Sequence, residues 1–289
     1  MNDVIEAGID YLAMTLPIGH KAYPEWVTSC QHAIDLLIGA GNVPRVGAFR
    51  GYDGIWCGGG FTGQRDDGAY LHIPGAWAGR LWSTVHHPDA HYSRLDLQAT
   101  IRYEEFDAQL AHKAYTAANT YNETRALRQR RKLRLITNND GGSTCYVGSR
   151  TSDHYCRLYN KAAASGDEYY ERCWRFEVEL HNDTATAAAT YIYEGHRSQS
   201  RAAAATVWHY FAERGVHPAW TREGEENAVL SRTTPPSDID RKLAWLAAQV
   251  APTVKLLREL VGDTIVFRAL GVAPDEDKLP VENRPEAEG

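Results

Sequence analysis

The sequence has 289 residues and is 43% hydrophobic, which is enough for one large domain or two small ones. Its formal net charge of −6 excludes a protein that is basic throughout, but local basic clusters leave binding to nucleic acid open. Residues 275–289 hold six acids and two bases, or −4, so the remainder of the chain carries −2. No apolar run approaches the length of a membrane span, so no membrane partner is expected.

Cysteine usage favours a reducing compartment. The five cysteines are an odd number, no two have C-x-x-C spacing, and nothing typical of a signal peptide precedes them. Reduced, mostly buried thiols in a cytoplasmic protein are therefore expected, rather than disulfides or a zinc site.

The N-terminal third predicts strands separated by helices. Glycines 58–60 lie between apparent strands and are not followed by a lysine in P-loop order, which favours a hairpin connection over a phosphate cradle. The elements expected here are a strand at 9–16, a helix at 24–40, a hairpin within 44–63, a strand at 69–74 and a short helix at 75–81.

Three histidines, His86, His87 and His91, cluster near Asp89 and admit two interpretations. Three imidazoles suit a metal, whereas Pro88 and the small polar neighbours indicate a solvated loop. Nothing in the sequence fixes a ligand geometry, so the loop is favoured.

The stretch 144–161 predicts two strands joined by a polar turn at 148–153. Because strand side chains alternate between faces, Cys156 and Leu158 share an apolar face. The opposite face carries two phenols and two cations, which are Tyr155, Arg157, Tyr159 and Lys161. Our hypothesis is that Tyr159 attacks a DNA phosphate there. The alternative is an exposed strand face with amphipathic tyrosines.

Two further strands, at 94–103 and 173–180, also present a polar face against an apolar one. If the three strands share a sheet, their polar faces converge on one open surface. Grouped carboxylates suit Mg²⁺ or Mn²⁺, and cations would neutralise charge on a phosphate. Cross-strand salt bridges, with Arg175 paired to Asp96 or a glutamate, remain the alternative. The polar residues are Arg94, Asp96, Gln98, Thr100, Arg175, Glu177 and Glu179.

The remaining segments are mostly helical in pattern. A helix predicted at 104–131 ends in a basic run that is either a contact to the DNA backbone or a solvated helix end. An Asn-Asn-Asp-Gly-Gly sequence predicts a hairpin turn between strands at 132–137 and 143–147. Helices are expected at 184–194, 198–214 and 239–261, with Pro252 kinking or splitting the last. The basic run consists of Arg125, Arg128, Arg130, Arg131 and Lys132.

Four motifs occur in order and together resemble the replication initiation factor family, which comprises initiators of rolling-circle plasmids and relaxases of integrative conjugative elements. They are Arg-Leu-Asp-Leu (94–97), Gly-Ser-Arg-Thr-Ser-Asp (148–153), Arg-Leu-Tyr-Asn-Lys (157–161) and Trp-Arg-Phe-Glu-Val-Glu-Leu (174–180). The likeness runs from about residue 10 to about residue 260 and includes the helical segment 242–252.

The resemblance implies Tyr159 as nucleophile and a divalent metal held by acidic residues. Arg157 and Lys161 are expected to assist because their positive charges would neutralise the charge that develops on the phosphate oxygens. The matching acids are Asp96 with Glu177 or Glu179. Family members often have a second aspartate where this chain has Thr100, which puts the ligand set in doubt because a hydroxyl is a weaker ligand. Arg175, Tyr155 and the basic run Arg128, Arg130, Arg131 and Lys132 are the expected DNA contacts.

The expected fold is α+β, a central antiparallel sheet with helices packed on one face and an open DNA-binding face, plus a helical C-terminal region. The expected domains are a nicking domain at 1–182, a helical region at 183–271 and an acidic disordered tail at 272–289. The expected activity is metal-dependent nicking of one strand at an origin, with a 5′-phosphotyrosine intermediate and religation. A conjugative relaxase and a catalytically silent DNA-binding regulator are the alternatives. Origin DNA, a host helicase and a second copy of the chain are the expected partners.

Overall fold

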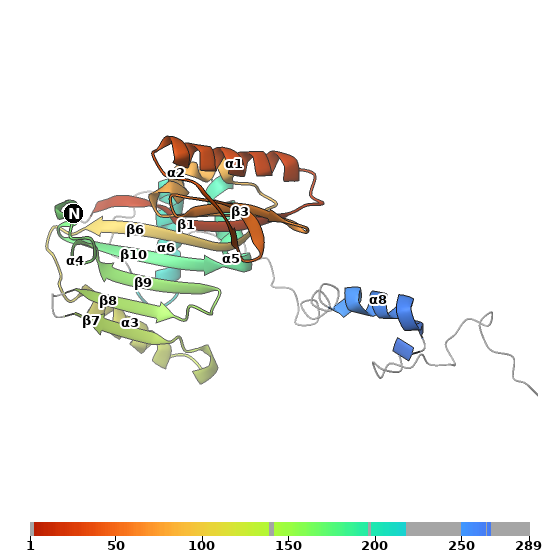
Figure 1. The fold of residues 1–289 in the computed structure, drawn as a ribbon. Coiled ribbons are helices and arrows are strands. Elements are labelled where there is room, and N and C mark those ends of the chain that lie inside the picture. Colours follow the sequence, from red (N-terminus) through yellow and green to blue (C-terminus); the bar gives the residue numbers. More distant parts are fainter. Residues whose placement is uncertain (1–2, 139–141, 196–197, 218–249, 264, 267–289) are drawn as a thin grey trace, which may run out of the picture. The chain divides into compact units, whose positions relative to one another are not determined.

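Strand β6 (His91–Arg102) lies near the middle of one antiparallel sheet. The computed structural model describes residues 3–138, 142–195, 198–217, 250–263 and 265–266. Within these ranges ten strands pair in the order β2-β3-β4-β5-β1-β6-β10-β9-β8-β7 (Figure 1). The other strands are β1 (Asp3–Pro17), β2 (Arg45–Phe49), β3 (Tyr52–Cys57), β4 (Gly60–Arg65), β5 (Gly68–Pro74), β7 (Leu133–Thr137), β8 (Ser143–Gly148), β9 (His154–Asn160) and β10 (Cys173–His181).

Helices cover the apolar face of this sheet. In Figure 1, α3, α5 and α6 lie behind the strands, and α1 and α2 lie by the β1–β5 half. The expected α+β class, with an antiparallel sheet and helices, is confirmed. The helices are α1 (Tyr23–Gly39), α2 (Ala76–Val85), α3 (Leu110–Glu123), α4 (Lys161–Ser165), α5 (Asn182–Glu194), α6 (Gln199–Ala212) and α8 (Ala251–Val261), with short 3₁₀ turns η1 (Leu127–Gln129) and η2 (Glu168–Tyr170).

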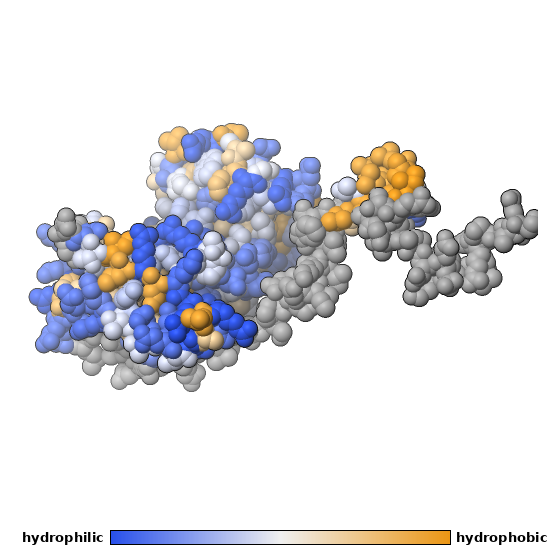
Figure 2. All heavy atoms as spheres, turned by 90° about the horizontal axis from the view of Figure 1, so that it is seen from below, coloured by the Kyte–Doolittle hydropathy of each residue, from blue (hydrophilic) through white to orange (hydrophobic). Residues whose placement is uncertain are grey.

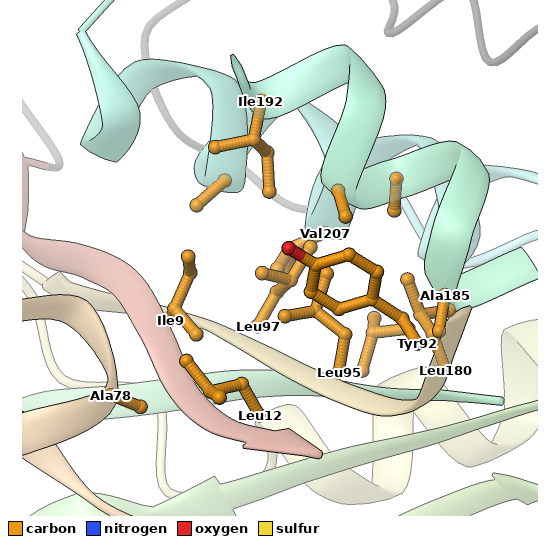
Figure 3. Close-up of a cluster of buried hydrophobic side chains, with 14 of the residues drawn as sticks. Ile9, Leu12, Ala78, Tyr92, Leu95, Leu97, Leu180, Ala185, Ile192 and Val207 are labelled. Atoms are coloured by element: carbon orange, nitrogen blue, oxygen red, sulfur yellow. The ribbon is translucent and has the colours of Figure 1, made fainter. Parts of the chain in front are cut away.

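The core lies between the sheet and α5 and α6. Leu95 and Leu97 of β6 point toward these helices, where Ile192 and Val207 meet them (Figure 3). The two helices are rich in alanine on their buried sides, and small side chains let a helix approach a sheet closely. Because these helices pack on the apolar face, they do not cover the polar face of the same strands, which carries the predicted site residues.

The chain divides into two compact units, residues 1–233 and 234–289. In the second unit, α8 carries exposed apolar side chains, including Leu256 and Leu260, and Figure 2 shows hydrophobic atoms gathered there. No described helix combines the length and apolar composition needed to cross a bilayer. Residues 239–249 of the helix expected at 239–261, and the tail expected at 272–289, lie outside the described residues.

The predicted hairpin within the glycine-rich segment is confirmed. Gly58 and Gly59 have φ values of +56° and +79° and form the turn between β3 and β4. Gly54 permits a close approach of these strands, because a Cβ there would lie 1.9 Å from the carbonyl oxygen of Thr62. This half of the sheet carries a small hydrophobic cluster on the same face as the polar strand residues, formed by Ala13 and the aromatic residues Tyr52, Phe61 and Tyr70.

Some boundaries differ from the sequence predictions, and those in β1, β9 and α3 affect predicted site residues. Strand β1 begins at Asp3, six residues before the predicted start. Strand β9 ends at Asn160, whose side chain accepts from the backbone N–H of Ala163, so Lys161 begins α4 and is not a strand residue. Helix α3 covers Leu110–Glu123, half of the helix predicted at 104–131, and the basic run therefore follows the helix.

Candidate active site

The three predicted polar strands lie side by side, with β10 between β6 and β9. Their antiparallel register puts the chosen residues on one face, as the alternation predicted. The opposed pairs across β6 and β10 are Asp96–Glu179, Gln98–Glu177 and Thr100–Arg175. Those across β10 and β9 are Glu179–Tyr155, Glu177–Arg157 and Arg175–Tyr159.

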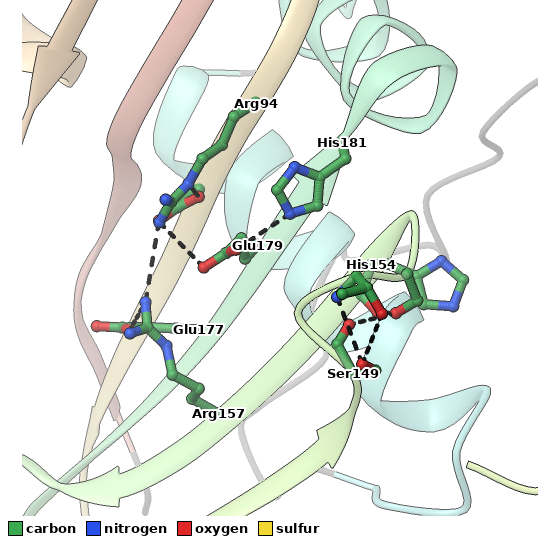
Figure 4. Close-up of polar contacts among 10 residues, drawn as sticks. Arg94, Ser149, His154, Arg157, Glu177, Glu179 and His181 are labelled. Carbon is green, nitrogen blue, oxygen red and sulfur yellow. Dashed lines mark hydrogen bonds and ion pairs between the residues drawn. The ribbon is translucent and has the colours of Figure 1, made fainter. Parts of the chain in front are cut away.

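Arg94 joins two of the predicted metal ligands. Its Nε and Nη2 donate to both oxygens of Asp96 over 2.8 and 2.6 Å, and Nη2 also donates to Glu179 over 3.0 Å (Figure 4). His181 Nε2 lies 3.0 Å from the other Glu179 oxygen. Burial raises the pKa of Asp96 despite Arg94. For Glu179, the His181 hydrogen bond and Arg94 outweigh burial and lower the pKa.

Arg157 and Tyr159 share the third carboxylate, Glu177. The Tyr159 hydroxyl donates to Glu177 Oε1 over 2.5 Å, and Arg157 Nη2 lies 2.8 Å from Oε2. The same Arg157 nitrogen is 3.9 Å from Asp96, which links this group to the Arg94 cluster. Burial, followed by the negative charge of Glu177, raises the pKa of Tyr159 far above its usual value, so the phenol is protonated at neutral pH.

Arg175 forms a further group with a residue that the sequence analysis missed. Its Nε donates to Thr100 Oγ1 over 2.8 Å, and its Nη2 lies 2.6 Å from Glu6 Oε2. The Tyr170 hydroxyl donates to the same Glu6 oxygen over 3.1 Å. Glu6 escaped selection because the predicted first strand began at residue 9. One register shift lies between Val4 and Glu6 and another follows Ile9, so simple alternation along β1 would not have placed Glu6 either.

The carboxylates are less open than the sequence analysis expected. Asp96, Glu177 and Glu179 are 4–6% exposed, and Arg175 is 5% exposed. Buried charges are costly unless they are paired, and here each carboxylate bonds an arginine. The cross-strand salt bridges that stood as the alternative interpretation are therefore present, and Tyr159 is a member of the same network.

Two predicted residues occupy positions that differ from the expectation. Lys161, at the start of α4, has its Nζ 4.9 Å from the ring centroid of Tyr170. Burial and the positive charge of Arg175 lower the pKa of Lys161. Tyr155 is 8% exposed and stacks on Tyr146, with ring centroids 5.7 Å apart, so its ring is largely covered. Tyr146, which lies opposite Arg157, was not selected from the sequence.

The basic run lies apart from the carboxylates, between α3 and β7. Arg128, Arg130, Arg131 and Lys132 are all exposed. The amide groups of this segment are fixed by Asn122, whose side chain bonds both the N–H and the carbonyl of Arg131. The run is therefore a surface segment of defined backbone, and its contact with DNA stays a prediction.

The implied metal does not fit the described arrangement. A divalent cation needs oxygen ligands that can turn toward it, whereas Arg94 and Arg157 bond the three predicted ligands. Within the described ranges, no three His, Cys, Asp or Glu side chains are grouped as a metal site.

In the histidine cluster, His86 bonds the Tyr92 hydroxyl over 2.6 Å, and burial lowers the pKa of His86 to about 4, which agrees with a packing role.

Comparisons with known proteins agree with the architecture. A solved structure described as a rolling-circle replication initiator protein from Geobacillus stearothermophilus is similar, with a TM-score of 0.51 and 17% sequence identity. The similarity covers 78% of this chain and 92% of that chain, and at this identity it shows a shared fold. No curated protein matches the chain. The sequence profile described as Replication initiation factor matches residues 90–268, more than half of the chain, so the chain belongs to the replication initiation factor family.

Proposed function

We propose that this chain is a rolling-circle replication initiator that nicks one strand of origin DNA through Tyr159. The observation that carries the proposal is the 2.5 Å hydrogen bond from the Tyr159 hydroxyl to Glu177, with Arg157 on the other carboxylate oxygen. Family membership and the shared fold support the initiator role. A nucleophile hydrogen-bonded to a base that a third group holds in place is the arrangement expected for covalent catalysis.

The proposed first step is an attack of the Tyr159 oxygen on the phosphorus at the nick site. The bond from phosphorus to the 3′-oxygen breaks, the phenol proton passes to Glu177, and the leaving 3′-oxygen takes up a proton from water to become a hydroxyl. The product is a 5′-phosphotyrosine ester, which preserves the energy of the broken bond and allows religation by the reverse attack. Arg157, Arg175 and Lys161 supply the positive charge that stabilises the phosphorane-like transition state.

The resemblance to the family implies a divalent metal, Mg²⁺ or Mn²⁺, with Asp96, Glu177 and Glu179 as its ligands. Because these carboxylates bond arginines, no step above is assigned to the metal. Origin DNA is the proposed partner. A host helicase and a second copy of the chain stay predictions, as do the DNA contacts of Tyr155 and the basic run.

A denaturing gel tests the proposal. Wild-type protein incubated with labelled single-stranded origin DNA is expected to give a band that stays shifted in denaturant. Tyr159→Phe is expected to abolish this band while origin binding, measured by fluorescence anisotropy, stays within a few-fold. If Tyr159→Phe still forms the adduct and Tyr155→Phe does not, the wrong tyrosine has been assigned.

Two alternatives predict different outcomes in the same assay. A relaxase of an integrative element would form the same adduct, but on a transfer origin in place of a replication origin. A silent DNA-binding regulator is favoured by Thr100, which stands where family members often have an aspartate and here bonds Arg175. The regulator would bind origin DNA and give no adduct across a panel of origins of both kinds.

A further inference from the structure

Two tyrosines form a stacked pair beside the candidate active site. Tyr146 of β8 and Tyr155 of β9 lie on the same face as Tyr159, with ring centroids 5.7 Å apart and ring planes within 13° of parallel. Tyr155 is 8% exposed, whereas Tyr146 is only half-buried. The covered ring of Tyr155 therefore packs against Tyr146, and part of the Tyr146 ring remains open to solvent.

Packing in a hydrophobic core does not account for this pair. Neither tyrosine belongs to a hydrophobic cluster of the described residues. Cys145 and Val147 alternate with Tyr146 along β8 and are buried on the other face of the sheet, where α3 packs (Figure 1). The tyrosine pair thus lies on the face that α3 does not cover.

The side of Tyr159 toward β7 is also positively charged. The three carboxylates of the candidate active site lie on β6 and β10, whereas β7 and β8 contain no acidic residue. Arg134, opposite Tyr146 across β7 and β8, is exposed and has its Cζ 5.9 Å from the Tyr146 ring centroid. Arg150, in the turn after β8, is exposed and has its Cζ 5.8 Å from the Tyr155 ring centroid. A phosphodiester chain that extends from the reacting phosphate is therefore attracted toward β7.

We propose that Tyr146 and Arg134 form a subsite for single-stranded DNA next to Tyr159. This inference rests on the proposed function. An unpaired base of a nucleotide that flanks the nick site stacks on the open part of the Tyr146 ring, and Arg134 bonds the adjoining phosphate. Because Tyr146 lies one strand across and two residues along from Tyr159, roughly 8 Å between Cα atoms, the stacked nucleotide is close to the reacting phosphate. The subsite selects unpaired DNA because the bases of a duplex are already stacked on one another.

Abasic substitution in the origin DNA tests the stacking step. Every full-length protein in this experiment carries Tyr159→Phe, so that fluorescence anisotropy measures binding without cleavage. In a series of single-stranded origin oligonucleotides, one base near the nick site at a time is replaced by a tetrahydrofuran abasic residue. The ratio of the two dissociation constants, abasic over intact, is measured within one protein, so a smaller folded fraction in a variant does not change this ratio.

With Tyr146 present, one abasic position is expected to weaken binding about tenfold. Tyr146→Phe keeps the ring and should keep this ratio, whereas Tyr146→Leu should make the abasic and intact oligonucleotides bind equally. Arg134→Gln should weaken binding to every oligonucleotide and reduce the slope of log Kd against log salt concentration by about 0.7. Tyr193→Leu and Arg201→Gln, on the helices α5 and α6 that pack on the opposite face, are the matched controls.

Photocross-linking gives a readout that does not depend on affinity. A 5-iodouracil at the same position is expected to cross-link to tryptic peptide 135–150, in which Tyr146 is the only aromatic residue. Cross-links confined to other peptides, or an abasic effect that Tyr146→Leu leaves unchanged, overturn the subsite. A Tyr146→Leu loss of affinity that is as large on the fully paired duplex also overturns it. Absence of any covalent adduct with the wild-type protein in the denaturing gel overturns the proposed function instead, so the two failures are distinguishable.

Discussion

The hydroxyl of Tyr159 and Oε1 of Glu177 lie 2.5 Å apart across the neighbouring strands β9 and β10. A phenol with a raised pKa is a poor nucleophile unless its proton leaves as the new bond forms. Glu177 is placed to take that proton, and Arg157 fixes its orientation. The pair therefore gives the weak nucleophile a built-in acceptor.

Replacing this acceptor is expected to slow cleavage without abolishing binding. Glu177→Gln should lower the single-turnover rate of origin cleavage about 100-fold, because an amide cannot accept the phenol proton. Glu171→Gln is the control, because the Glu171 side chain is 80% exposed and forms its ion pair with Arg172. Wild-type cleavage by Glu177→Gln, measured by quenched flow, would show that Glu177 is not the acceptor.

Thr100 is expected to contribute to stability through its hydroxyl. It is fully buried, accepts from Arg175 Nε and donates to Gln98 Oε1 over 3.1 Å. Thr100→Val keeps the shape but leaves the Arg175 donor and the Gln98 acceptor unpaired, so the free energy of unfolding should fall by about 1–3 kcal/mol in urea. Thr100→Ser keeps the hydroxyl and should lose less. Equal losses for the two variants would mean that packing, and not hydrogen bonding, matters here.

The His181–Glu179 pair predicts a pH-dependent part of the stability. The hydrogen bond to Glu179 raises the pKa of His181 above 6.5, although burial opposes it. A raised histidine pKa stabilises the fold fully below the unfolded value and loses this effect as pH rises through the folded value. The stability difference between wild type and His181→Gln should thus be constant just below pH 6.5 and shrink above it.

Because the His181 ring is partly exposed, the difference should be no more than about 1 kcal/mol. Urea unfolding between pH 5.5 and about 8.5 measures it, within a range where Glu179, whose pKa is lowered, stays ionised. A difference that grows with pH would contradict the assigned direction.

Arg94 is expected to compete with a divalent cation. Its Nη2 bonds both Asp96 and Glu179, two buried carboxylates that lie opposite each other on neighbouring strands. Arg94→Ala should therefore bind Mn²⁺ at least about tenfold more tightly than wild type, or ~1.4 kcal/mol, in isothermal titration. Arg102→Ala, at the exposed end of the same strand, is the control. Unchanged Mn²⁺ affinity in Arg94→Ala would exclude this competition.

Cleavage in excess chelator tests the family-level expectation separately. The resemblance predicts that nicking stops when divalent metal is removed and returns with Mg²⁺ or Mn²⁺. Full activity in chelator would show that Asp96, Glu177 and Glu179 do not act as metal ligands in nicking and serve only as partners of the arginines and of Tyr159.

Period-two alternation determined much of this site. Asp96, Glu177 and Tyr159 were placed on one face of three strands because strand side chains alternate regardless of what surrounds them. The same rule gave the apolar face that α5 and α6 cover. Glycine and asparagine chemistry located the hairpins, since positive φ at Gly58 and Gly59 suits few other residues.

Only the tertiary structure decided which charges pair. Glu6 meets Arg175 across 169 residues of chain, and the register shifts in β1, which place Glu6 opposite Thr100, leave no signal in the sequence. The bond from Arg94 to Glu179 depends on strand order, which alternation does not encode. The burial of Asp96, Glu177 and Glu179 likewise depends on the side chains of the adjacent strands, which the local sequence does not specify. Local sequence sets which way a side chain points, whereas its partner and its exposure depend on strands that pair over long separations.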